Sequence, residues 1–408
     1  MKGSEGIPAL KLTVLNKLIR KFPTAPTMFF SNMFPSQNYD SDNIRWEIEY
    51  GSAGMTPFVA PGAPAPAIGL DGVGEASAKA AYFKEKMYFD EEFLNNLREP
   101  GTTAKYLTAE RQLARGMQKL RNRCDRRREW MMSQMVTQGG FSYLAKGGTR
   151  LSVSYGIPES HLVTLGTDRQ WDTGTKKNPV EDIFDAKTTL QDDAGVTPKY
   201  AMLNSNLLKL LVLDKDIQAL LQKSAFGNGD LFANPSQVIG SLLGVGNIQV
   251  YDETFEVTGW LLSNVTGGSS TDIVVDNAAD FEVGGTLRLI DMSEASSWED
   301  RKITAVNVST NTITVASAPT NSYIAGEDKV IMRKKFIDDD TFLIFSDTSA
   351  DGMKIAEFMQ APYGLERQWG MNVDKKDEWD PDGTWTRVQD KGLPVLYYPD
   401  TIYRLKVR

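Results

Sequence analysis

The chain has almost no histidine or cysteine, the residue types on which most transition-metal sites and many nucleophilic active sites depend. His161 and Cys124 are the only ones in 408 residues. Zinc centres with several His or Cys ligands and intrachain disulfides are therefore excluded. A serine or cysteine nucleophile would have to use His161, and no G-x-S-x-G elbow occurs in the chain. We predict that His161 is a structural or surface residue, and we expect no catalytic residue and no enzyme activity.

Signals for membranes, secretion and nucleotides are missing as well. No apolar run approaches 18 residues, and the first nine residues lack the apolar region of a signal peptide. We therefore expect no membrane contact. Gly244-Val245-Gly246-Asn247 follows a predicted helix and precedes a predicted strand, the reverse of a dinucleotide-binding turn. The formal charge of −8 argues against a protein whose whole surface grips nucleic acid.

One weak metal candidate lies near the end of the chain. Residues 378–383 place carboxylates at alternate positions before a glycine, as a calcium loop does. Gln389 stands where such a loop has its bidentate glutamate, and Pro381 stiffens the turn. A solvated turn between two tryptophan-bearing segments is the preferred interpretation. The sequence predicts no metal ion and no cofactor.

The first 26 residues are basic and contain one amphipathic helix. Leu15, Leu18, Ile19 and Phe22 follow the spacing of an apolar helical stripe. Such a stripe needs a surface on which to dock. Two alternatives stay open: the helix lies on its own domain, or Leu15, Leu18 and Phe22 contact a neighbouring subunit.

A long loop is predicted between two strand-like segments. Residues 44–50 alternate apolar and charged side chains, residues 51–74 are rich in Gly, Ala and Pro, and regularity resumes at residues 81–89. Fifteen residues per leg would reach about 50 Å, whereas a compact chain of this length has a radius of gyration near ~22 Å. The loop, with Phe58 near its tip, is therefore expected to cross a neighbouring subunit. The alternative is a disordered tip on a monomer.

The strongest helical pattern covers residues 109–136, with Thr108 as the expected N-cap and Gly139-Gly140 beyond the end. Its length would be about 42 Å. Arg126, Arg127 and Arg128 fan across about 200° of the helix, so they cannot all point into one groove. We expect at least one to meet an acidic group on its own or a neighbouring subunit. We predict that these arginines serve subunit contacts more than DNA binding. Contact with a polyanion inside a shell is the second interpretation.

The remainder alternates between two kinds of pattern. From residue 179 helices and strands alternate, which indicates an α/β domain. The expected elements are a helix at 180–191, a strand at 200–203, Leu-rich helices within 205–222, a helix at 235–243 and a strand at 247–251. Six short strands follow, at 260–264, 272–275, 286–290, 302–308, 312–315 and 329–332. They predict a small barrel or sandwich. Because the α/β pattern resumes at residues 341–345, we expect this domain to be inserted into the α/β domain.

Several short motifs follow one another along the chain. They are Phe29-Phe30, Asn96-Leu97-Arg98-Glu99-Pro100, Trp171-Asp172, Asn178-Pro179, Val250-Tyr251-Asp252, Asp338-Asp339-Asp340-Thr341 and Lys391-Gly392-Leu393-Pro394. In this order they resemble the lambda protein E type of tailed-bacteriophage major capsid proteins, over about residues 20–255 and 336–408. The β insert departs from that family's best-known member.

The resemblance implies an α+β chain with the Hong Kong 97-type capsid fold. The implied parts are an N-terminal arm (1–43), a strand with the extended E-loop (44–90), a peripheral domain with a spine helix (91–177, helix 109–136), the first part of an axial domain (178–257), the inserted β domain (258–335) and the return strands of the axial and peripheral domains (336–408).

The implied function is that of a structural major capsid protein, which self-assembles as pentamers and hexamers into an icosahedral head. Its partners would be copies of itself, a scaffolding protein, a portal, often a decoration protein, and packaged double-stranded DNA by non-specific proximity only. The protein would be assembled in the host bacterial cytoplasm and reside in the virion. Two alternatives stay open: the shell of a cellular nanocompartment of the same fold, and a tail or baseplate protein.

Overall fold

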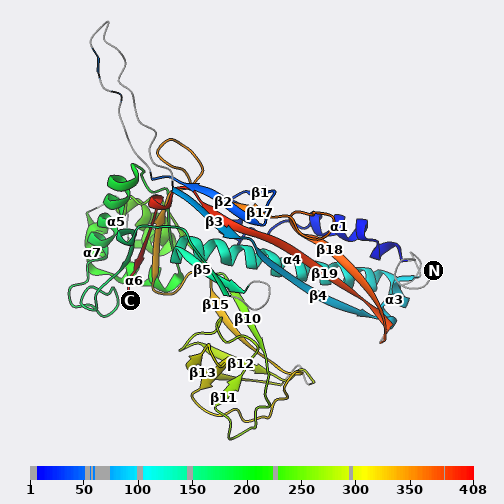
Figure 1. Cartoon of the computed structure of the whole chain (residues 1–408). Coiled ribbons are helices and arrows are strands. Elements are labelled where there is room, and N and C mark those ends of the chain that lie inside the picture. The colour runs from blue at the N-terminus through cyan, green and yellow to red at the C-terminus, as the bar shows by residue number, and fades with distance from the viewer. Residues whose placement is uncertain are drawn as a thin grey trace. The chain divides into compact units, whose positions relative to one another are not determined.

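The computed structural model describes residues 7–50, 56, 58–59, 74–98, 104–144, 150–223, 228–293, 297–380 and 382–408. The chain divides into two compact units (Figure 1). The main unit is Met1–Tyr251 with Ile337–Arg408, and the insert is Asp252–Phe336. No helix in the described ranges is long and apolar enough to cross a lipid bilayer.

A long twisted sheet forms one half of the main unit. Its strand order is β1-β17-β19-β18, and β4 pairs with β19. The strands are β1 (Ser36–Asn38), β4 (Ala81–Asp90), β17 (Ala356–Gln360), β18 (Asn372–Trp379) and β19 (Asp382–Leu396). Along β4 the side chains alternate, so that Phe83, Met87 and Phe89 face the core while Tyr82 and Lys84 are exposed. One face of this sheet is therefore buried, and the other is partly exposed.

The buried face is covered by α4 (Ala104–Gln138), a helix of 35 residues that Figure 1 shows running along β4 and β19. Leu113, Met117 and Leu120 pack with the sheet residues Val373 and Val388 in one apolar cluster. The helix starts at Ala104, so the prediction of Thr108 as N-cap is wrong. The reason is that residues 104–107, Ala-Lys-Tyr-Leu, form helix readily and continue the pattern one turn earlier.

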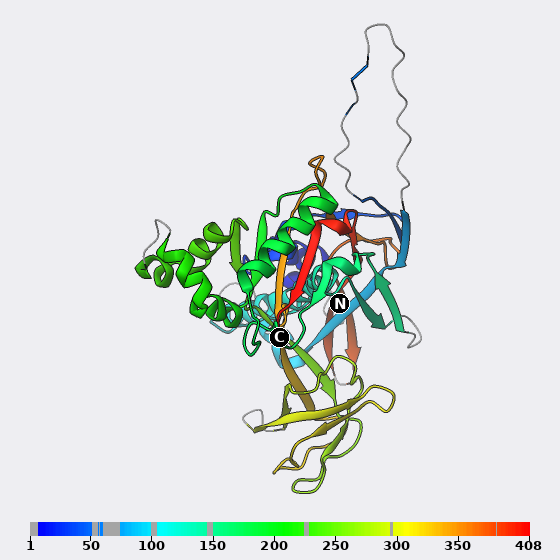
Figure 2. The same ribbon diagram turned by 90° about the vertical axis from the view of Figure 1, so that its left-hand side faces the viewer.

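The second sheet lies in the other half of the main unit, with the order β7-β20-β16-β8-β9. Its strands are β7 (Leu162–Thr164), β8 (Tyr200–Leu203), β9 (Asn247–Val250), β16 (Thr341–Phe345) and β20 (Ile402–Lys406). Figure 2 shows β20 in red beside β16 in orange, an antiparallel pair. All five residues of β16 are buried, which explains its continuous apolar run.

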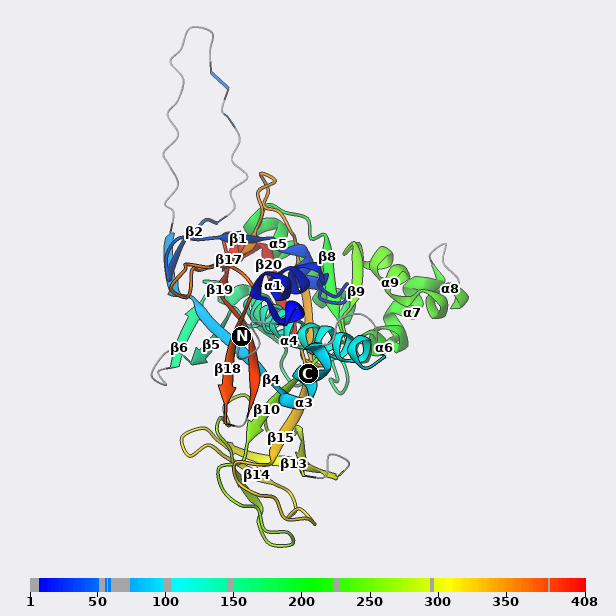
Figure 3. The same cartoon turned by 90° about the vertical axis from the view of Figure 1, so that its right-hand side faces the viewer.

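Five helices belong to this second sheet. They are α5 (Pro179–Ala194), α6 (Ser205–Leu213), α7 (Lys215–Gln222), α8 (Asn228–Ala233) and α9 (Pro235–Leu243), and Figure 3 shows α7, α8 and α9 gathered beside β9. Asn178 caps α5 by accepting a hydrogen bond from the Glu181 N–H. Gly244 ends α9 with a φ of 62°, so the glycine-rich run there is a helix C-cap.

The rest of the main unit consists of short elements. They are α1 (Leu12–Lys21), α2 (Phe29–Met33), α3 (Glu91–Arg98) and the strand pairs β2 (Asn43–Ile48) with β3 (Gly74–Lys79) and β5 (Gly140–Leu144) with β6 (Arg150–Ser154). Most of the predicted long loop, residues 51–55, 57 and 60–73, lies outside the described residues. The antiparallel pairing of β2 and β3 returns the chain to the place where it left.

The insert is a curled sheet with the order β10-β15-β12-β13-β14-β11. Its strands are β10 (Thr254–Trp260), β11 (Asp272–Val274), β12 (Thr286–Ile290), β13 (Trp298–Asn307), β14 (Thr312–Val315) and β15 (Lys329–Lys335). A bridge between Leu261 and Val275 joins the two edges, so the sheet closes into a barrel. The predicted strand at 260–264 is wrong, since the observed strand β10 ends at Trp260. Its side chains that point into the core alternate from Phe255 and Val257 onward, earlier than predicted.

Candidate assembly surface on the β18–β19–β4 sheet

The three adjacent arginines of α4 lie in different environments. The Arg128 Nε donates to the Asp390 Oδ2 at 2.5 Å, and its guanidinium stacks over the Phe358 ring at 4.9 Å. Asp390 has no exposed side-chain surface, so this is a buried ion pair within one subunit. Arg127 is exposed and lies 5.2 Å from the Trp130 ring, and Arg126 is exposed. The expectation that one of the three meets an acidic group therefore holds for Arg128.

The apolar stripe of α1 lies against its own subunit. Leu15 is fully buried and Leu18 and Phe22 are partly buried in the cluster beneath α4. The Val373 N–H donates to the Asn16 side chain at 2.8 Å, which fastens α1 to the edge of β18. Leu15 thus has no surface left for a neighbour, which favours the alternative of a helix on its own domain. A neighbour contact of Leu18 and Phe22 stays a prediction.

Phe58, the predicted contact residue of the loop, is fully exposed in the single subunit. His161 is fully buried, with Nδ1 at 3.0 Å from the Ile402 carbonyl and Nε2 at 2.9 Å from Asp193. The imidazole thus joins the turn before β7 to β20 and α5. This arrangement fits the structural role predicted for His161.

A second buried acid holds the N-terminal segment on α4. Glu129 has no exposed surface and accepts hydrogen bonds from the N–H groups of Phe30 and Ser31 at 3.0 and 2.7 Å. The hydroxyls of Ser31 and Tyr251 donate to it at 2.6 Å each. Burial raises the pKa of Glu129, and these donors oppose the rise. The sequence showed Glu129 only as part of an arginine-rich run, so reasoning from the sequence missed its role.

The partly exposed face of the long sheet was also missed, although the alternation of side chains in β4 and β19 could have indicated it. We call it the outer sheet face, and it consists of Tyr82, Lys84, Lys86 and Tyr88 of β4, Trp385, Arg387 and Gln389 of β19, and Asp374 and Glu378 of β18. Pairing places Lys86, Arg387 and Asp374 in one row across three strands. The sequence around residues 378–383 indicates only a turn, and it did not show that the segments on either side, β18 and β19, pair as a hairpin.

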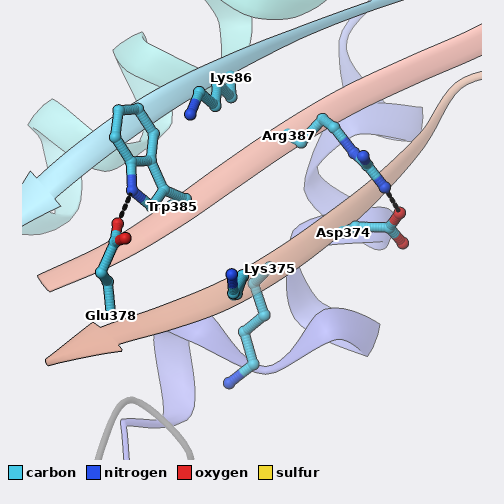
Figure 4. Close-up of a pocket in the computed structure, with 7 residues that line it drawn as sticks. Lys86, Asp374, Lys375, Glu378, Trp385 and Arg387 are labelled. Atoms are coloured by element: carbon cyan, nitrogen blue, oxygen red, sulfur yellow. Dashed lines mark hydrogen bonds and ion pairs between the residues drawn. The ribbon is translucent and has the colours of Figure 1, made fainter.

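Figure 4 shows how one end of the outer sheet face is organised. The Arg387 Nη2 donates to the Asp374 Oδ2 at 2.7 Å, and the Trp385 indole N–H donates to Glu378. The Lys86 ammonium lies 3.7 Å from the centre of the Trp385 ring, a cation–π contact. These side chains line a hollow of about 310 Å³. The charged side chains of this hollow are thus paired with one another or with the Trp385 ring within the subunit.

A larger groove of about 950 Å³ continues from this hollow between α1 and residues 364–369. Leu365 is fully exposed at its rim, and Leu12 of α1 is 41% exposed. The Tyr82 hydroxyl donates to the Gln389 side chain at 2.6 Å in the floor. Burial raises the pKa of Tyr82, so this donor stays protonated at neutral pH. The groove therefore places two exposed apolar side chains beside fixed polar groups, and protein–protein interfaces combine apolar and polar contacts of this kind.

Comparison with known proteins identifies the family. A family model described as phage major capsid protein E matches residues 11–267, more than half of the chain. The chain belongs to the phage major capsid protein E family. It is accordingly a capsid shell protein, a component of the virion that assembles with copies of itself. No curated protein matches the sequence.

A solved structure with a TM-score above 0.5 places this capsid protein in the predicted fold. The putative capsid protein of a prophage from E. coli CFT073 is 13% identical, with a TM-score of 0.54 over 98% of this chain and 99% of that chain. A phage-related protein from Bordetella bronchiseptica RB50 is 11% identical, with a TM-score of 0.47 over 97% and 96% of the two chains. The Hong Kong 97-type capsid fold is confirmed. Membership of a head-shell family disfavours the tail or baseplate alternative.

Proposed function

We propose that copies of this chain assemble as pentamers and hexamers into an icosahedral head that encloses double-stranded DNA. Two large apolar side chains carry the proposal, since Phe58 and Leu365 are fully exposed on a subunit of the capsid family. Isolated exposed apolar residues are common, but Phe58 lies in the predicted long loop and Leu365 lies on the rim of a groove. The subunit's role is structural, with interface burial in place of chemistry.

The contact we propose joins the segment that carries Phe58 to the groove of a neighbouring copy. Standard stable interfaces bury about 1,200–2,000 Å² in total, and aromatic anchors in pockets contribute a large share of the binding energy. Phe58 would be such an anchor, and the exposed Leu12 and Leu365 would flank it. The fixed ion pair of Asp374 and Arg387 would set the register, since buried or rim charges select orientation more than affinity.

The family resemblance supports a division of labour along the chain. We assign residues 1–43 to an N-terminal arm, 44–90 to the E-loop region, 91–177 to a peripheral domain with α4 as its spine, and 178–257 with part of 336–408 to an axial domain. A scaffolding protein, a portal and a decoration protein are the further partners that this proposal includes, with assembly in the bacterial cytoplasm.

Disulfide trapping tests the contact. Phe58→Cys and Leu365→Cys are introduced together, and particles are oxidised and separated on a denaturing gel. The native Cys124 does not interfere, because it is buried and burial raises the pKa of its thiol well above the ordinary range. We expect ladders of linked subunits from the double variant and monomers from each single variant. Closed shells of the double variant without ladders would overturn this pairing, and the absence of shells from wild-type chains would overturn the assembly.

A further inference from the structure

An exposed basic stripe runs along α4, on the side turned away from the sheet. It consists of Arg111, Arg115, Lys119 and Arg126, all of them exposed. At 100° per residue these four positions fall within an arc of about 80°, opposite the buried Leu113, Met117 and Leu120. Fifteen residues at 1.5 Å each make the stripe about 23 Å long.

These four cations differ from the other basic residues of the same helix. Arg121, Arg123 and Arg128 each pair with a carboxylate, namely Asp125, Glu85 and Asp390. Among the described residues, no ion pair involves Arg111, Arg115, Lys119 or Arg126. The acids further along α4, Asp125 and Glu129, are buried. The stripe is therefore a row of one sign of charge without an internal counter-charge.

The end of the stripe has a structural cause. Ser133 and Thr137 continue the same side of the helix beyond Arg126, and both are buried. There α2 lies on the helix and Glu129 binds its N–H groups. This side of α4 is thus exposed up to Arg126 and buried from Ser133 onward, which is why the stripe ends there.

We infer that the basic stripe binds the phosphate backbone of double-stranded DNA without sequence preference, which rests on the proposed function of a DNA-filled head. For Arg126, which is exposed and has no ion pair among the described residues, this replaces the subunit contact expected from the sequence. The charge is complementary, and a straight row of about 23 Å spans six to seven base pairs at 3.4 Å each. Gln112, Gln118 and Asn122 lie between the cations and supply neutral donors of the kind that contact phosphate oxygens. The net charge of −8 argues against attraction over the whole surface, so DNA binding requires a local basic patch such as this one.

A protein partner, such as an acidic segment of a scaffolding chain, is the competing occupant. Protein interfaces are anchored by large apolar or aromatic side chains in pockets. The exposed side of α4 from residue 111 to 126 contains only Ala114 and Gly116 as small, half-buried apolar residues. The stripe has charged groups and polar donors but no large apolar or aromatic side chain that could anchor a protein. This favours, as its ligand, a polyelectrolyte with regularly spaced charges.

The test is binding of the full-length, unassembled subunit to a 30-base-pair duplex of mixed sequence, measured by fluorescence anisotropy between 25 and 200 mM KCl. The variant Arg115→Gln/Lys119→Gln/Arg126→Gln is compared with the control Lys209→Gln/Lys215→Gln/Lys223→Gln. The control removes the same three charges from exposed positions around α6 and α7.

We expect the stripe variant to bind at least ten-fold more weakly at 50 mM salt and the control to stay within two-fold of wild type. The slope of log K against log salt should flatten by about 0.9 for each phosphate that the variant no longer neutralises. Equal slopes for both variants would overturn the inference. So would unchanged duplex binding by a stripe variant that fails to bind an acidic scaffolding protein. Wild-type chains that bind DNA but form no shells would contradict the proposed function alone.

Discussion

A single buried polar residue, Glu129, makes the hydrogen bonds that attach the N-terminal segment to α4. Glu129 accepts four hydrogen bonds in a site with no exposed surface, and two of them come from the backbone of the N-terminal segment. Hydrogen bonds to a charged group each contribute about 1.5–3 kcal/mol, and an unsatisfied buried partner costs a similar amount. One carboxylate therefore ties together α2, α4 and the residue after β9.

We predict that Glu129→Gln lowers the free energy of unfolding by about 2–3 kcal/mol. The amide keeps the volume of the carboxylate but turns an N–H₂ toward groups that are themselves donors. Urea unfolding of the unassembled subunit measures the effect. Glu110→Gln, an exposed change on the same helix, is the control and should leave the midpoint unchanged. Equal midpoints for the two variants would contradict the role given to Glu129.

The Arg128–Asp390 pair yields a second prediction at this scale. The Arg128 side chain is only 12% exposed and that of Asp390 not at all. Arg128→Met should destabilise the subunit by about 3–5 kcal/mol, because it leaves Asp390 charged and buried. The double variant Arg128→Met/Asp390→Leu should recover most of that stability. Arg126→Met, at an exposed position, should stay within about 0.5 kcal/mol of wild type. A double variant no better than Arg128→Met would refute the charge argument.

The insert is the element whose independence can be argued most directly. It has its own core, with Leu261, Ile273, Leu287 and Val330 among residues that are fully buried. Thr254 pairs with Lys335, so the two ends of the insert leave side by side. Insertions with close ends are tolerated well because the parent chain need not change its path.

We predict that residues 252–336, produced alone, unfold cooperatively and give β-type circular dichroism. The complementary deletion, with residues 252–336 replaced by two glycines, should leave the main unit folded. A non-cooperative melt of the isolated segment would show that its core needs the remainder of the chain.

Within the insert, Glu299 provides a dependence on pH. Burial would raise the pKa of this carboxyl, but the N–H groups of Thr320 and Asn321, the Tyr323 hydroxyl and Arg301 outweigh it and hold the pKa below its ordinary value. Because folding lowers the pKa of Glu299, its ionised carboxylate stabilises the folded state at pH values above the pKa of the unfolded chain. This stabilisation is lost as the pH falls through the pKa of the folded state.

Acidification from pH 6 to pH 3 should therefore weaken the turn at residues 318–323, measured as a decrease in amide protection by hydrogen exchange after correction for the intrinsic rate. Glu299→Gln should show weaker protection already at pH 6 and a smaller change with pH. A wild-type turn with constant protection over this range would contradict the prediction.

At the scale of the whole molecule, the partly exposed outer sheet face and the exposed Phe58 and Leu365 indicate a subunit that is completed by its neighbours. We predict that wild-type protein from infected cells sediments as closed shells in analytical ultracentrifugation. Leu365→Asp should sediment as small oligomers with unchanged urea stability, because a rim charge opposes association but not folding. A stable monomer with residues 51–80 packed on its own surface would refute this arrangement.

Much of the fold follows from local sequence patterns. The strands Tyr200–Leu203 and Thr341–Phe345 and the helix Pro235–Leu243 begin and end where period and capping residues predict. The reason is that their ends carry strong local signals, such as Gly244 after α9 and Asn204 after β8. Composition alone predicted that few residues were available for metal or nucleophilic chemistry. An ordered series of short motifs was sufficient for the family.

Only the tertiary structure decided how polar residues are used. Arg126 and Arg128 are two positions apart on one helix, yet one is exposed and the other lies in a buried pair with a residue 262 positions away. Glu129 likewise needed α2 and Tyr251 to become a buried hub. Helical periodicity assigns a direction to each side chain, but partners distant in sequence determine whether that direction meets solvent, a carboxylate or a backbone N–H. For that reason the sequence determined the elements and the family, and the fold determined which charges remain free for partners.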